Sequence, residues 1–154
     1  MKINKVLILV FSTMLVIGLT NCKSSKFTGQ TTLLKSTTSG QLAVKASGYG
    51  SGKGVSVRNA IENAFRNILL RGIPGSNQNT PLLGNNSEKT YKANKRFLDN
   101  MLENEINSFI LEQKNSNYNF FSINDPSSEV ELLINLAALR SHLEQNGIIR
   151  GFGL

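Results

Sequence analysis

The sequence contains very little cysteine, histidine, proline and tryptophan. Among 154 residues there are one Cys, one His, three Pro and no Trp. A single cysteine excludes an internal disulfide, so a folded domain has to be held together by packing alone. One cysteine and one histidine also leave no Cys/His metal cluster and no Cys–His nucleophile pair. We therefore expect neither a metal nor a cofactor.

Long apolar runs are missing as well. The longest, residues 6–19, has 14 uncharged residues, whereas a membrane-spanning helix needs about 20. Lys2 and Lys5 precede it. A short basic segment followed by a short apolar segment is typical of a secretory signal peptide, which is cleaved off during export and does not belong to the folded domain.

The apolar run ends with Leu19-Thr20-Asn21-Cys22, which holds the only cysteine. Residues 1–22 resemble the signal and lipobox of bacterial lipoproteins, although Asn21 stands where Gly, Ala or Ser is usual. The resemblance implies a signal peptide over 1–21, cleavage before Cys22, and acylation of that cysteine with diacylglycerol and a further chain such as palmitate. Two or three acyl chains hold a protein on a bilayer essentially permanently. The alternatives are an ordinary secretory signal and a buried core cysteine.

The residues after the cysteine bear on location. Lys23 follows Cys22, so the Asp that signals inner-membrane retention in many lipoproteins is absent, and no acidic run follows. By the same resemblance, we expect a lipid-anchored protein of the cell outer membrane that faces the periplasm. Its partners would be the membrane and other envelope proteins, and not nucleic acid.

The charge balance from Cys22 onward is moderately basic, with 15 Lys or Arg and 10 Asp or Glu side chains. A solvated surface of mixed charge explains this excess. Four basic residues lie on the polar side of an expected helix, namely Lys89, Lys92, Lys95 and Arg96. Attraction to anionic lipid or to an acidic partner is the alternative to a plain solvated helix face.

The chain divides into a tether and one domain. Residues 22–40 are rich in Ser and Thr and show no period, so they predict a lipid-anchored flexible tether. Residues 41–154 predict a single α+β domain, a small sheet of about three strands with two or three helices packed on one face.

Periodicity predicts the elements of this domain. Residues 41–49 alternate as a half-buried strand, and 56–70 have a helical apolar stripe with Ser56 as N-cap and Gly72 as stop. Small Ala60 and Ala64 would let this helix approach the sheet closely. We expect a second helix from Ser87 to about Gln113, strands over 118–123 and 129–136, and a helix over 138–146. One helix over 126–146 is the competing interpretation of the last part.

The segment GYGSGKG, residues 48–54, lies between the first strand and the first helix. It does not match a P-loop, which needs Gly where Ser47 stands and Ser or Thr where Gly54 stands. It does not match a dinucleotide-binding pattern either, because the third glycine of that pattern would fall on Lys53 or Val55. A flexible turn is one interpretation. The other is an anion or small-ligand site, since backbone amides at a helix start attract anions, with Gly50, Gly52, Lys53 and Gly54 as the binding residues.

Residues 71–86 form a long expected loop with two prolines and three glycines. Loops longer than about 12 residues inside compact domains are usually functional or disordered. We therefore expect the contact surface for a partner here, and Leu82 and Leu83 could also act as apolar plugs. The candidate contact residues are Arg71, Ile73, Pro74, Asn77, Pro81 and Leu82.

Two further groups could carry chemistry. Glu129 and Glu131 would share one face of a strand, and paired carboxylates serve in sugar hydrolysis. His142 could take part in a Ser-His-acid arrangement, but no Gly-x-Ser-x-Gly motif is present. Exposed, solubilising positions explain these residues better than a hydrolase does.

The stretch LAVKASGYG, followed by a helix with Ala60 and Ala64 inside, resembles the LPP-twenty-like envelope lipoproteins and the amino-terminal domain of the flagellar T protein. The resemblance covers residues 41–72. It implies an α+β domain that acts in assembly and contacts, without known catalysis. The function expected from the sequence is thus a lipid-anchored structural or protein-interaction module that is not an enzyme.

Overall fold

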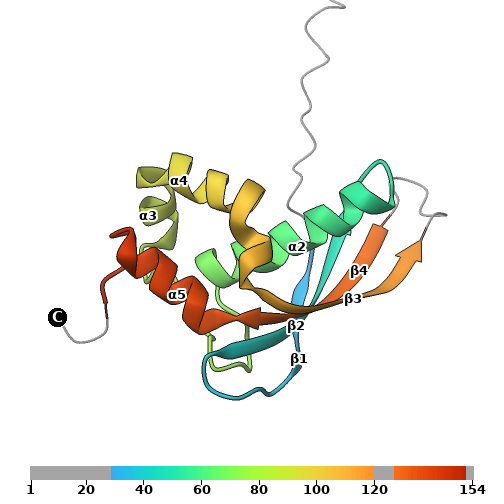
Figure 1. Cartoon of the computed structure of the whole chain (residues 1–154), viewed down its shortest axis with the longest axis horizontal. Coiled ribbons are helices and arrows are strands. Elements are labelled where there is room, and N and C mark those ends of the chain that lie inside the picture. Colours follow the sequence, from blue (N-terminus) through green and yellow to red (C-terminus); the bar gives the residue numbers. More distant parts are fainter. Residues whose placement is uncertain (1–28, 120–126, 152–154) are drawn as a thin grey trace, which may run out of the picture.

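The computed structural model describes residues 29–119 and 127–151. They form a four-stranded antiparallel sheet with helices on one face (Figure 1). The strand order is β1-β2-β4-β3. The α+β class is confirmed, and the sheet has one strand more than expected. The elements are, in chain order, β1 (Thr31–Lys35), β2 (Gln41–Tyr49), α2 (Lys53–Leu70), α3 (Ser87–Ala93), α4 (Lys95–Asn100), the π-helical turn η2 (Met101–Glu105), the 3₁₀ turn η3 (Ile106–Phe109), β3 (Ile110–Asn119), β4 (Ser127–Asn135) and α5 (Leu136–Gln145).

The central strands β2 and β4 pair along their whole length, from Gln41 opposite Asn135 to Tyr49 opposite Ser127. Alternate residues of each strand are buried, as the period of 2 predicts. The competing single helix over 126–146 is therefore wrong. The helix that follows β4 begins at Leu136, because the Asn135 side chain accepts a hydrogen bond from the Ala138 amide at 3.0 Å.

Helix α2 crosses the sheet very closely. A Cβ on Gly48 would lie 2.1 Å from the backbone nitrogen of Ala60, so glycine and alanine face each other where helix and strand meet. The helix begins at Lys53, three residues before the expected cap at Ser56. Ser56 is buried in the first turn instead, with its Oγ 2.6 Å from the Oγ of Ser128. These small residues hold α2 against β2 and β4.

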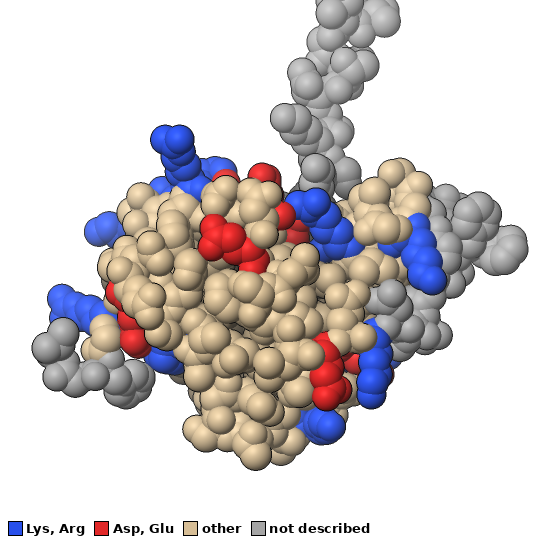
Figure 2. Space-filling model, in the orientation of Figure 1, with Lys and Arg blue, Asp and Glu red and all other residues tan. Residues whose placement is uncertain are grey.

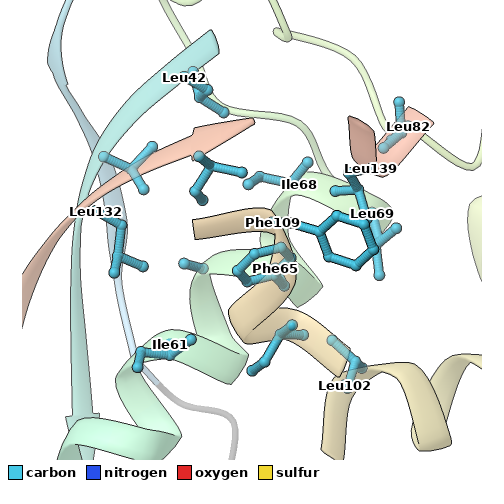
Figure 3. Packing of buried hydrophobic residues seen from close by; sticks show 14 of the residues in the cluster. Leu42, Ile61, Phe65, Ile68, Leu69, Leu82, Leu102, Phe109, Leu132 and Leu139 are labelled. Atoms are coloured by element: carbon cyan, nitrogen blue, oxygen red, sulfur yellow. The ribbon is translucent and has the colours of Figure 1, made fainter. Parts of the chain in front are cut away.

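One hydrophobic core lies between the sheet and the helices (Figure 3). Phe65 of α2 is at its centre, with its ring centroid 6.4 Å from that of Phe109. The sequence also predicts that three apolar residues after the last helix, Ile148, Ile149 and Phe152, pack against this core. Ile148 and Ile149 do so, and Phe152 lies outside the described residues. Within residues 29–119 and 127–151, no helix combines the length and the hydropathy of a membrane span.

Strand β1 differs from the sequence-based expectation, which places residues 31–35 in the flexible tether. They pair with β2 through the register Thr31 opposite Ala46 and Leu33 opposite Val44. Leu33 also packs against the core. Backbone pairing with an otherwise open strand edge therefore overrides a Ser/Thr-rich composition. The first part of the expected tether, 22–28, lies outside the described residues.

The long helix expected over 87–113 is broken into shorter pieces and ends at Phe109. Asn94 separates α3 from α4, and its side chain donates to the Thr90 carbonyl at 3.0 Å. Residues 110–113 belong to β3, which pairs with β4. These residues join the sheet rather than continue the helix. Ile110 lies opposite Ile134, which lies opposite Leu42, so the three side chains form one row across the sheet. Of the strand expected over 118–123, residues 118 and 119 lie in β3 and the rest lies outside the described residues.

Candidate functional site

Cys22, the expected lipidation site, lies outside the described residues. The described chain begins at Gly29, on the side of the sheet edge formed by β1. Here the amide of Ser47 donates to the Gln30 carbonyl at 2.9 Å, and the Gln30 amide donates to Ser47 Oγ at 3.0 Å. A Cβ on Gly29 would overlap the Ser47 carbonyl oxygen, at 1.8 Å. The chain therefore enters the fold in close contact with the second half of β2.

The glycine-rich turn joins β2 to α2, as expected. The Asn59 side chain donates to the Tyr49 carbonyl at 2.6 Å and ties the end of the strand to the helix. A Cβ on Gly50 would lie 2.6 Å from Cγ1 of Val55, so the inner side of the turn is filled by the helix itself. Gly52 and Gly54 face open space. Of the four candidate ligand-binding residues, Lys53 and Gly54 are exposed in the first turn of α2.

The loop over 71–86 is packed on the core by its apolar residues. The amides of Leu82 and Leu83 donate to the carbonyls of Ile68 and Leu69 at 3.0 and 3.1 Å, which adds the loop to the end of α2. Both leucines are buried, so their expected role as plugs is confirmed.

Burial divides the candidate contact residues of this loop. Ile73 and Leu82 are buried, so in this structure they stabilise the loop and are not available to a partner. Arg71, Pro74 and Asn77 are exposed, and Pro81 is half-buried. Only the exposed part of the expected contact surface can meet another protein.

A hollow of about 580 Å³ lies between this loop and β1. The Asn67 side chain, at the end of α2, donates to Thr31 Oγ1 at 2.9 Å inside it. Its lining residues come from the start of the described chain, β1, α2 and the loop, namely Gly29, Gln30, Thr31, Thr32, Asn67, Arg71, Gly72 and Pro74. The hollow thus brings two of the exposed loop candidates, Arg71 and Pro74, beside the edge strand.

The Glu pair and the histidine are not brought together. Glu129 lies on the open face of the sheet and forms an ion pair with Lys45 of the neighbouring strand at 2.8 Å. His142, on α5, has its Nε2 atom 3.3 Å from a Glu105 carboxylate oxygen. The imidazole also stacks on Phe97, with ring centroids 5.6 Å apart. Among the described residues, no group of three or more His, Cys, Asp or Glu could hold a metal ion.

The basic residues of the second helical region do not form one uniform patch. Lys95 forms an ion pair with Asp99 one turn later. Lys89, Lys92 and Arg96 are exposed. On the face shown in Figure 2, basic and acidic side chains are interspersed among neutral ones. This arrangement is typical of a solvated surface.

The most connected polar cluster was missed by the sequence analysis. Buried Tyr91 of α3 donates its hydroxyl proton to an Asp99 carboxylate oxygen at 2.5 Å. Arg66 of α2 donates to the same hydroxyl at 2.6 Å, and its guanidinium lies over the Tyr91 ring. The i,i+4 spacing of Lys95 and Asp99 was the only sequence signal for this cluster.

The protonation states of the cluster favour a structural role. Burial and the hydrogen bond to Asp99 raise the pKa of Tyr91 to about 12. Burial alone would raise the pKa of Asp99, but hydrogen bonds from Lys95 and Tyr91 and the charges of Lys95 and Arg66 lower it overall. Near neutral pH, tyrosine therefore stays a proton donor and aspartate stays an anion. The cluster holds α2, α3 and α4 together and has no group poised for proton transfer.

No protein-family model, no curated protein and no solved structure matches this chain.

Proposed function

We propose that this chain is a lipid-anchored lipoprotein of the cell envelope, acylated at Cys22, whose α+β domain acts as a structural or protein-interaction module without catalysis. The observation that carries the proposal is the coincidence of a basic head, a 14-residue apolar run and the only cysteine at its end. The outer membrane, on its periplasmic side, is the proposed location, because Lys23, and not an acidic residue, follows the cysteine.

The described domain is consistent with a module that makes contacts. Its most connected titratable cluster, around Tyr91 and Asp99, joins three helices and is suited to stability rather than reaction. Its hollow beside β1 is lined in part by exposed Arg71 and Pro74. We place the partner contact at this hollow and at the adjacent Asn77.

Mass spectrometry of the protein purified from membranes tests the anchor. We expect an amino-terminal Cys22 that carries diacylglycerol, and a larger precursor when lipoprotein signal peptidase is inhibited. Cys22→Ser should abolish both the added mass and membrane retention, whereas Ser24→Ala should change neither. A native product with a bare start at or beyond residue 22 would overturn the proposal.

Cross-linking on intact membranes tests the contact surface. Arg71→Glu combined with Asn77→Ala should reduce the recovery of the cross-linked partner. The melting temperature should change little, because both residues are exposed and the hydrogen bond that is lost, from Asn77 to the Gln41 carbonyl at 3.3 Å, is exposed as well. Arg96→Glu is the matched control on another helix and should leave recovery unchanged. Equal recovery from both variants would place the contact elsewhere.

A further inference from the structure

Two large apolar side chains are exposed on either side of the glycine-rich turn. Tyr49, the last residue of β2, is 44% exposed, and Val55, in the first turn of α2, is 47% exposed. Lys53 lies between them, is exposed and makes no ion pair with any described residue. Single exposed apolar residues are ordinary, but here an aromatic, an aliphatic and a cationic side chain share one short turn.

The turn is held firmly in place. Gly48, just before it, packs against the backbone of Ala60, and Gly50 packs against the start of α2. The Asn59 side chain binds the Tyr49 carbonyl. The exposure of Tyr49 and Val55 is therefore a property of the fold and not of a loose loop.

The described chain enters the fold beside this turn. Gly29 and Gln30 contact Ser47, which is two residues before Tyr49 in β2. Two residues of a strand span about 7 Å. In Figure 1 β1 emerges from behind α2 and runs down to the β1–β2 turn at the bottom of the view, whereas the β2–α2 turn lies at the upper right.

The chain between the proposed anchor and the fold is short. From Cys22 to Gly29 there are seven peptide steps, which reach at most about 25 Å when fully extended. A domain of this size has a diameter of about 35 Å. The lipid anchor therefore keeps the end of the domain that carries Gly29 and Tyr49 nearer to the bilayer than the opposite end.

We propose that the turn from Tyr49 to Val55 is a membrane-contacting surface that docks on the phospholipid bilayer in which Cys22 is anchored, a proposal that rests on the acylation proposed above. Tyrosine rings are enriched at the level of lipid headgroups, where one end of the ring is apolar and the other is hydrated. Val55 adds apolar contact, and Lys53 is attracted to anionic headgroups. Docking would fix the orientation of the domain, so that the hollow at Arg71 is presented to partners in a constant direction.

Tryptophan fluorescence can test this docking because the chain has no tryptophan of its own. The full acylated chain with Tyr49→Trp is reconstituted into vesicles that contain phosphatidylglycerol and bromine-labelled phospholipid. We expect strong quenching of this tryptophan by the labelled lipid. Leu111→Trp is the matched control, since Leu111 is 47% exposed and lies at the other end of the sheet, about 25 Å from Tyr49. Its tryptophan should show little quenching.

A charge variant tests the part assigned to Lys53. In the Tyr49→Trp chain, Lys53→Gln should lower the ratio of docked to undocked domain about fivefold on anionic vesicles at low salt. Lys35→Gln is the control, because Lys35 is also exposed and lies at the far end of β1. It should leave the ratio unchanged. An equal loss for both variants would show that net charge acts instead of this turn.

The outcomes separate this proposal from the proposed function. The mass and the vesicle flotation of each sample report whether Cys22 is acylated and holds the chain on the membrane. If both chains float with the vesicles but the Tyr49→Trp chain is quenched no more than the Leu111→Trp chain, docking is refuted and the anchor stands. If the chain carries no lipid, the proposed function fails, and docking fails with it.

Discussion

Alkaline pH should selectively weaken the contact between Tyr91 and Asp99. The pKa of Tyr91 is raised from 10.0 to about 12, first by burial and then by the hydrogen bond to Asp99. As the pH rises, the unfolded chain therefore loses this proton before the folded chain does. The stabilisation is fully present below pH 10 and is lost as the pH rises toward 12. A shift of this size corresponds to about 2–3 kcal/mol of folding free energy.

Urea unfolding between about pH 8 and pH 12 measures this loss. All chains carry Cys22→Ser, which removes the proposed acylation site. Tyr91→Phe is the control because it keeps the ring and removes only the titrating hydroxyl, while the lysines titrate equally in both chains. We expect the free-energy difference between parent and Tyr91→Phe to shrink by about 2–3 kcal/mol over this range.

A second variant checks the cause of the shift. Asp99→Asn removes the carboxylate that accepts the hydrogen bond from the Tyr91 hydroxyl. The pKa of Tyr91 should then be raised less in the folded chain, so the loss of stability at alkaline pH should be smaller than in the parent. Parallel stability curves for the parent and Tyr91→Phe would refute the reasoning, because they would mean that Tyr91 titrates alike in the folded and unfolded chains.

Two other predictions concern the sheet and α2. Gly48→Ala should destabilise the domain by about 3 kcal/mol or prevent folding, because the new Cβ would meet the Ala60 backbone; Gly54→Ala, in open space within the helix, should instead stabilise it by about 0.5–1 kcal/mol in the same urea unfolding measurement. Lys45→Met should change the free energy of unfolding by less than about 1 kcal/mol, since its ion pair with Glu129 is half-exposed; a larger loss would show that the open face of the sheet is not simply solvated.

The elements that could be predicted from sequence are those with one buried face. In β4, buried and half-buried residues alternate along the strand, and β2 follows the same alternation apart from Ala43, which is also buried. Helix α2 has a helical stripe around Phe65. Gly72, expected to end this helix, also acts as a local signal, with a φ of +77° after the helix. Such patterns depend on neighbouring residues only, so they can be recognised without the fold.

The two edge strands could not be predicted in the same way. In β1, Leu33 packs on the core while Leu34 is exposed, and the register shifts between Leu33 and Lys35. In β3, Ile110 continues the helical spacing of the preceding residues, although it pairs opposite Ile134. Edge strands carry bulges and polar residues that limit pairing with other chains, and these same features hide them from periodicity.

The position of the glycine-rich turn between a strand and a helix is predictable from the sequence, whereas its surroundings are not. The alternation of β2 already places Tyr49 opposite in direction to Gly48, and the glycines that follow predict a turn. The sequence does not show that Gln30 bonds to Ser47, because residues 29–35 have no periodic pattern that predicts a strand. Only the pairing of β1 with β2 brings Gly29 and Gln30 beside Ser47, two residues before Tyr49. A turn that sequence patterns leave open as an anion site thus lies beside the place where Gly29 and Gln30 meet β2, and its exposed tyrosine, valine and lysine are the side chains on which the proposed docking to a bilayer rests.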